Sequence, residues 1–199
     1  MLQFLENCVV ELYGLDMAAT YQHAFVYIRQ LAVHLRQAHA KIKAKQAHDQ
    51  VYNWQTVHSV KVWARVLAQY AGVEQLQLLH YPLVQVLHGI IALVPTPRHF
   101  PLRLQCTRML HMLAAATATP NKTPLFVNSA AFLLEVLQYG AFFKKPSAYS
   151  GKPPLIAHML RAPDKLLGSR AYLVRHVDDM RRCVRATMLT AATLEHDLH

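Results

Sequence analysis

The chain has 199 residues, 53% of them hydrophobic, which is enough to bury a substantial core within one domain. Its 21 lysines and arginines outnumber 11 acidic residues, giving a net charge of +10 and favouring an acidic partner or a polyanion such as RNA. The three widely spaced cysteines exclude a disulfide framework and a zinc-finger spacing, and no apolar run reaches the length of a membrane span, so we expect no membrane partner.

The first 72 residues predict three helices. Residues 1–13 carry an apolar stripe that ends near Gly14, and Asp16 is a suitable N-cap for a second helix that runs towards Gln46. The stripe of this second helix becomes thin at three lysines, Lys41, Lys43 and Lys45. These lysines form either a solvated helix end or a tip that contacts phosphate.

A third helix is expected to begin at Asp49 or Asn53 and to end at Gly72. Trp54 and Trp63 occur at helical spacing and are interpreted as core anchors, with base stacking as the alternative. The like-charged pair Lys61 and Arg65 is expected to face outwards.

A repeated start marks the centre of the chain, residues 81–112. Tyr81-Pro82-Leu83 recurs as Phe100-Pro101-Leu102, and an apolar stripe with helical spacing follows each copy. Pro95 and Pro97 stop the first helix, and Pro101 suits the first turn of the next. Two such helices are typical of one repeat in a solenoid. The predicted core residues of this part are Tyr81, Pro82, Leu83, Ile90, Pro101 and Leu110.

The same centre is free of acidic residues from position 75 to position 134. Arg98 and Arg103 lie inside this stretch. Because no carboxylate is near them in the sequence, we expect both to face RNA or an acidic partner.

Thr123 and Pro124 predict the start of a further helix that closes near Gly140. Residues 141–154 contain three prolines and read as a basic loop, in which Lys144, Lys145 and Lys152 either meet an anionic partner or belong to a merely flexible connection. A last helix is expected from Asp164 or Ser169 onward. The resulting organisation is a helical-repeat core (1–140), the loop (141–154) and a C-terminal helical segment (155–199) that packs on the same solenoid.

The sequence offers little for catalysis. It contains no glycine-rich phosphate loop, no H-E-x-x-H and no C-x-x-C. His80, His88 and His111 adjoin apolar stripes, which favours structural roles. Cys106 with a nearby histidine would be the nucleophile of a hydrolase or transferase, but it lies on an apolar stripe, where thiols are usually inert. We therefore expect no enzyme, no cofactor and no metal.

Five blocks of the sequence, in order, resemble the nucleolar complex protein 2 family. They are residues 21–38, 51–67, 81–103, 132–137 and 160–172. The resemblance implies a non-enzymatic assembly factor for the large (60S) ribosomal subunit that acts in the nucleus, in both nucleolus and nucleoplasm. Family members are much longer, so we expect a fragment or a reduced version of the family's core.

The pattern of stripes predicts an all-α fold, a HEAT- or armadillo-like solenoid of antiparallel helix pairs. The resemblance further implies that the chain pairs with nucleolar complex proteins 1 and 3 and helps precursors of the large subunit to mature and to move within the nucleus. The alternative is a protein-binding adaptor of the nuclear-transport type without direct RNA contact.

Overall fold

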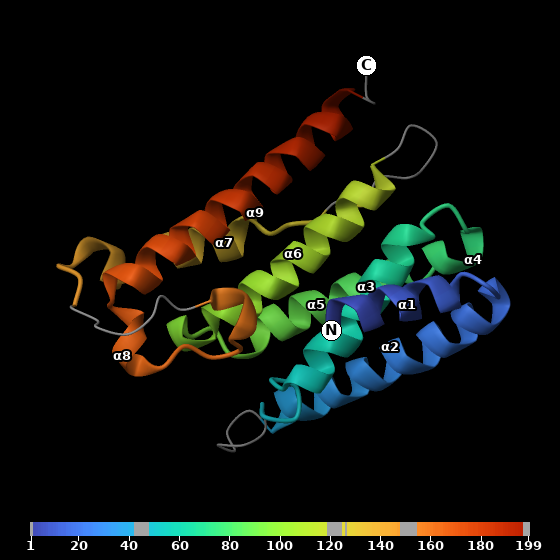
Figure 1. The fold of residues 1–199 in the computed structure, drawn as a ribbon, viewed down its shortest axis with the longest axis horizontal. Coiled ribbons are helices and arrows are strands. Elements are labelled where there is room, and N and C mark those ends of the chain that lie inside the picture. Colours follow the sequence, from blue (N-terminus) through green and yellow to red (C-terminus); the bar gives the residue numbers. More distant parts are fainter. Residues whose placement is uncertain (1, 42–47, 119–124, 126, 148–154, 197–199) are drawn as a thin grey trace.

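The computed structural model describes residues 2–41, 48–118, 125, 127–147 and 155–196. Within these ranges the chain is built from helices, with one isolated bridge between Ser147 and Ser169 (Figure 1). The expected all-α class is therefore confirmed.

Two of the three N-terminal helices begin at side-chain caps. The helices are α1 (Leu2–Tyr13), α2 (Met17–Ala40) and α3 (Trp54–Gln69). The Asp16 carboxylate accepts hydrogen bonds from the backbone N–H groups of Ala18 and Ala19 at 2.9 and 3.1 Å. The Asn53 side chain accepts one from Thr56 at 2.7 Å, which selects Asn53 over Asp49 as the start of α3.

The centre of the chain folds as α4 (Glu74–Gln77), α5 (His80–Leu93), the 3-10 turn η1 (Pro97–His99) and α6 (Phe100–Thr117). The buried Tyr52 hydroxyl donates to the Ile90 carbonyl at 2.8 Å and accepts from the Val94 N–H at 3.1 Å. A side chain from the segment before α3 thus satisfies backbone groups at the end of α5, where Pro95 prevents further helix.

The C-terminal part contains α7 (Ala130–Leu137), the 3-10 turns η2 (Gly140–Phe143) and η3 (Ile156–His158), α8 (Asp164–Leu167) and α9 (Arg170–His196). The predicted cap at Thr123 and Pro124 lies outside the described residues, and α7 starts later than expected.

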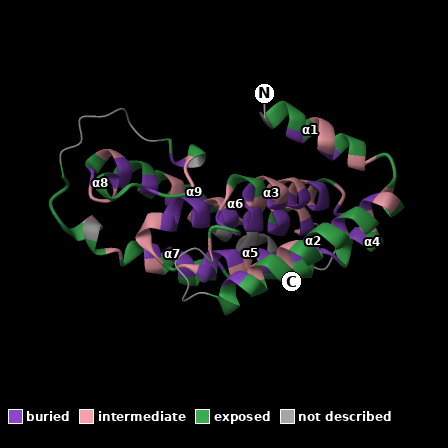
Figure 2. Cartoon of the chain, turned by 90° about the horizontal axis from the view of Figure 1, so that it is seen from below, coloured by how far each residue is buried: buried purple, intermediate pink, exposed green. Residues whose placement is uncertain are grey.

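Helix α6 is the centre of the packing. It packs against α3, α5 and α9, while α2 packs on α5 and α1 on α3 (Figure 1). Thirteen of the 18 residues of α6 are buried, including Leu104 and Thr107, which lie off the expected stripe. Figure 2 shows this burial as a purple band in the middle of the molecule. The less buried positions, such as Gln105, Arg108 and Met112, lie on one narrow side of the helix, so most of its circumference belongs to the core.

The core predictions divide into two groups. Trp63, Leu83, Ile90, Pro101 and Leu110 are buried. Trp54 and Tyr81 are 39% and 67% exposed, and Pro82 is exposed as well. The core assignment of these three is wrong. Tyr81 is about 200° around the helix from buried Leu83, so it faces the opposite side of α5. Trp54 is the first residue of α3 and packs on His58 at the surface, with ring centroids 5.6 Å apart.

One segment, Glu74–Leu93, is long and apolar enough to cross a membrane by length and composition, contrary to the expectation that none would be. It comprises two helices, α4 and α5, and 56% of its apolar window is buried inside the protein. This burial is typical of a core helix.

Candidate functional site

The structure provides no support for a Cys106 nucleophile. Cys106 is 2% exposed, and burial raises the pKa of its thiol to about 12, so the thiol is protonated at neutral pH. Within the residues described, no group of three histidine, cysteine or acidic side chains could hold a metal ion.

The histidines beside the apolar stripes have packing roles. His80 and His111 are buried, and a hydrogen bond of 2.9 Å joins His111 Nε2 to Ser129 Oγ. Burial lowers the pKa of both His88 and His111, which favours neutral rings at physiological pH.

Arg103 is buried and paired, so its assignment to an RNA-facing surface is wrong. The residue is 2% exposed, and two of its guanidinium nitrogens donate to the Glu135 carboxylate at 2.8 and 2.6 Å. The guanidinium also lies 4.4 Å from the centroid of the Phe132 ring. The hydrogen bond from Arg103 lowers the pKa of Glu135. Both Phe132 and Glu135 belong to α7, which therefore shields Arg103.

The other arginines of the acid-free stretch also find carboxylates. Arg98 pairs with Asp164, and its carbonyl accepts a hydrogen bond from the Ala162 N–H at 2.7 Å. Arg108 on α6 pairs with Asp179 on α9 at 2.5 Å. Acidic residues that follow the stretch in sequence are thus brought back to it by the fold.

A further polar cluster joins α1 to α3. Glu6 is 6% exposed, and its carboxylate lies 2.7 Å from Lys61 Nζ, 3.1 Å from His58 and 3.5 Å from Arg65. Burial alone would raise the pKa of Glu6, but hydrogen bonds from Lys61 and His58 lower it overall. The sequence predicts that Lys61 and Arg65 face outwards as a like-charged pair, whereas in the structure both side chains contact the Glu6 carboxylate.

Of the six lysines predicted from the sequence to contact RNA or an acidic partner, three lie within the described residues. Lys41, the C-cap of α2, is exposed, as are Lys144 and Lys145 after η2. None of these three forms an ion pair with a described residue. Lys43, Lys45 and Lys152 lie outside the described residues.

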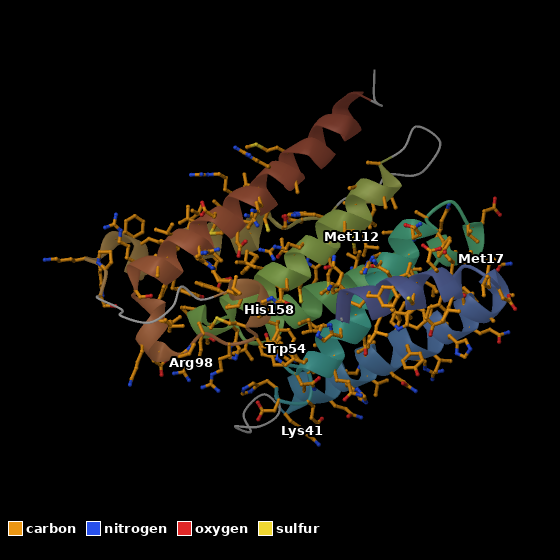
Figure 3. All side chains as sticks on the ribbon, in the orientation of Figure 1. Met17, Lys41, Trp54, Arg98, Met112 and His158 are labelled. Atoms are coloured by element: carbon orange, nitrogen blue, oxygen red, sulfur yellow. The ribbon has the colours of Figure 1, made fainter. Side chains whose placement is uncertain are left out.

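A groove lies between α2 and α5, at a place that no sequence motif indicates. Its volume is about 760 Å³. Ile28, Ala32 and Leu35 of α2 line it together with Val86 and Gly89 of α5. Met17 and Lys41 mark the two ends of α2 in Figure 3.

The groove also has a basic character. Arg29, Arg36 and His39 line it, and none of the described residues in its lining is acidic. The sequence contains a signal for this basic character, because α2 has no aspartate or glutamate among its 24 residues.

The described residues define an all-helical protein whose distinguishing features are basic and apolar surfaces. The chain belongs to the Noc2p family, whose model matches residues 1–193. This match confirms the family resemblance seen in the five sequence blocks.

Named relatives support the same assignment. The chain is 39% identical to the nucleolar complex-associated protein 2 of Arabidopsis thaliana over 86% of its own length, and 42% identical to nucleolar complex protein 2 of Drosophila melanogaster over 80%. A nucleolar complex protein 2 homolog of Caenorhabditis elegans is 37% identical over 81% of the chain. The chain spans 22%, 20% and 23% of these relatives' lengths, respectively.

Proposed function

We propose that the chain is a non-enzymatic helical scaffold that acts in the nucleolus and nucleoplasm during assembly of the large ribosomal subunit. The observation that carries this proposal is the family match across residues 1–193. The relatives' names refer to a nucleolar complex. The proposed partners are nucleolar complex proteins 1 and 3 and precursor particles of the large subunit, whose maturation and intranuclear transport the scaffold assists.

The scaffold is proposed to be a HEAT- or armadillo-like solenoid. The helix order supports this arrangement, because α2 packs on α5 while α3 packs on α6, as equivalent helices of stacked pairs do. Helix α9 continues the row by packing on α6. In this proposal, residues 1–140 are the repeat core, 141–154 are a basic loop and 155–199 extend the same stack.

Lysines and one arginine are proposed to contact rRNA or acidic protein tails. They are Lys41, Lys43, Lys45, Arg98, Lys144, Lys145 and Lys152. Arg98 forms an ion pair with Asp164, so it is the residue of this set with the least support as an RNA contact. Exposure and the lack of an ion pair with a described residue support Lys41, Lys144 and Lys145.

Charge reversal of the loop tests this contact. We expect Lys144→Glu, Lys145→Glu and Lys152→Glu together to lower co-sedimentation with precursor particles at least fivefold, because each reversal replaces attraction to phosphate by repulsion. A matched control reverses Arg170, Arg175 and Arg185, which are exposed on α9. Circular dichroism of both triple variants checks folding. Unchanged co-sedimentation of the loop variant would remove the loop from the proposal.

The second candidate function is a protein-binding adaptor of the nuclear-transport type without RNA contact. The internal pairing of Arg98, Arg103 and Arg108 favours it, since these charges are partly or wholly neutralised within the chain. Binding of the chain to large-subunit rRNA fragments between about 50 and 200 mM salt separates the two functions, because phosphate contacts weaken steeply over this range. Binding that is absent at every salt concentration would favour the adaptor.

A further inference from the structure

We propose that the groove between α2 and α5 binds one amphipathic helix of another protein, and that acidic residues flank the apolar stripe of that helix. The inference rests on the proposed function insofar as a scaffold needs partner surfaces, and it adds the place of binding and the chemistry of the partner.

The apolar lining of the groove indicates a hydrophobic contact. Phe25 on α2 and Leu78 at the end of α4 both line the groove, and these residues are 47% and 69% exposed. Such an exposed apolar surface, continuous with a groove, is typical of a protein-binding site.

The length of the groove suits a helix. Its lining on α2 extends from Tyr21 to Ala40. At 1.5 Å per residue this span is about 28 Å, or roughly five helical turns. A helix lying along it would insert side chains spaced at i, i+3, i+4 and i+7 between α2 and α5.

The charges of the groove specify an acidic occupant. Arg29 and Arg36 are seven residues apart on α2, so they lie two turns apart on nearly the same side of the helix. Neither forms an ion pair with a residue that the structure describes. Glutamates beside the apolar stripe of a partner helix would complement these arginines, whereas lysines there would be repelled.

The lining does not favour a nucleic-acid strand. Tyr21 and Phe25 are stacked with ring centroids 6.3 Å apart, but they lie at one end of the groove. Beyond them the floor is aliphatic, with Ala32, Leu35 and Val86. Bases stack on aromatic or guanidinium planes, and the only such planes beyond this end, among the described lining residues, are those of Arg29, Arg36 and His39. A continuous row of stacking platforms for a strand is therefore absent from the described lining.

The test uses the 199-residue chain and a designed probe. The probe is a fluorescent 18-residue helical peptide with leucines at i, i+3, i+4 and i+7 and glutamates on both flanks. Two further peptides carry lysine in place of glutamate, or the leucines in scrambled order. We expect fluorescence anisotropy to show at least tenfold tighter binding of the acidic amphipathic peptide than of either control, and a loss of this binding as salt rises.

Variants locate the binding site. We expect Phe25→Asp to weaken binding of the acidic peptide at least tenfold, whereas Phe4→Asp on α1 changes it less than twofold. Phe4 is the matched control because it is also an exposed phenylalanine on a helix, at 68% against 47%. Both substituted side chains are solvent-accessible, so folding is expected to survive, and thermal unfolding verifies this.

Charge exchange tests the specificity. Arg29→Glu with Arg36→Glu is expected to reverse the preference, so that the lysine peptide binds more tightly than the glutamate peptide. Arg175→Glu on α9 is the control, and it should leave the preference unchanged. A purely structural role of the two arginines would not produce such a reversal.

Three results would overturn the proposal. They are equal binding of the three peptides, unchanged binding by the Phe25→Asp variant, and self-association of the chain that this variant abolishes, since the last would make a second copy the occupant. None of these measurements involves a ribosomal particle. Failure of the peptide-binding proposal can therefore be distinguished from failure of the proposed function, because the first is measured with peptides and the second with precursor particles.

Discussion

Arg103 keeps its charge in the interior because two neighbours compensate for its lost hydration. Glu135 binds its guanidinium through two hydrogen bonds, and the Phe132 ring covers one face. Lysine would keep the charge but would lose the planar two-pronged geometry.

We therefore expect Arg103→Lys to reduce the free energy of unfolding by about 2 kcal/mol, because a single ammonium group cannot replace the paired hydrogen bonds. Urea unfolding measures the change. Arg98→Lys is the comparison, since the Arg98 side chain is 32% exposed. This substitution should lower the free energy of unfolding by less than about 1 kcal/mol. Equal losses at the two positions would contradict the structural role given to Arg103.

His176 gives the fold a sensitivity to acid. It is fully buried in a stack with Phe100, Phe142 and Tyr172, with ring centroids 5.2 to 6.1 Å apart. Its ring nitrogens have no hydrogen-bond partner among the described residues. Burial lowers its pKa from 6.5 to about 4, so the unfolded chain binds a proton more readily than the folded one.

The stability that neutral His176 provides is complete above pH 6.5 and is lost as the pH falls towards 4. We expect His176→Phe to keep the aromatic stack and to remove this loss, which corresponds to about 3 kcal/mol at pH 4. Chemical unfolding at pH 7.5 and pH 4 provides the comparison. His99, whose pKa burial likewise lowers to about 4, leaves part of the acid sensitivity in the variant. An identical pH dependence in both proteins would disprove the assignment.

Individual residues show where sequence reasoning succeeded and where it failed. Helix caps act over three residues, so Asp16 could be recognised directly. The pairing of Arg103 with Glu135 spans 32 positions and depends on how α7 is placed. Local patterns contain no such information, and the acid-free stretch was therefore read as an exposed basic surface.

At the scale of elements, the stripes identified α5 and α6 but not their different surroundings. Both helices carry regular apolar spacing. The stripe predicts which side faces a neighbour, yet it cannot show that burial on α6 extends beyond the stripe to Leu104 and Thr107. The groove beside α2 was missed for a related reason, since a groove is a property of two helices together.

Gly89 determines how closely α2 and α5 approach beside the groove. A Cβ atom at this position would lie 2.4 Å from Leu35 Cδ2 and 3.4 Å from Leu35 Cγ. The nearest atom is the end of a flexible side chain, which can rotate away from a single methyl group. It cannot make room as easily for a branched side chain.

We expect Gly89→Ala to change the free energy of unfolding by less than about 1 kcal/mol, because the higher helix propensity of alanine offsets the movement of Leu35. Gly89→Val should cost about 2 to 3 kcal/mol, since its extra methyl groups must separate the two helices. Thermal and urea unfolding compare the two variants. A large decrease in the free energy of unfolding of the Gly89→Ala variant would show that the Leu35 side chain cannot move.

At the scale of the whole molecule, α6 connects the N-terminal helices to the C-terminal segment. It packs on α3 and α5 on one side and on α9 on the other. The C-terminal segment has a smaller core of its own, formed by Ile156, Ala162, Leu166, Tyr172 and Leu173. Ion pairs of Asp164 and Asp179 add to the attachment of this segment.

We expect Asp164→Ala with Asp179→Ala to increase amide hydrogen exchange about tenfold in α8 and α9, because two ion pairs to the rest of the chain are lost. Exchange in α5 should not change. Asp178→Ala is the control, since the ion pair of Asp178 with a described residue lies within α9, to Arg181 at 3.9 Å. Faster exchange throughout the molecule would show instead that the C-terminal segment unfolds together with the other helices.

The return of Glu135, Asp164 and Asp179 to the arginine-rich centre has a practical consequence for shortened proteins. A version that ended before Glu135 would lack the carboxylates that pair with Arg98, Arg103 and Arg108, and it would expose Arg103. Its adhesion to RNA would then be an artefact of truncation, and it would mimic the very activity that an assay of the intact protein is meant to detect.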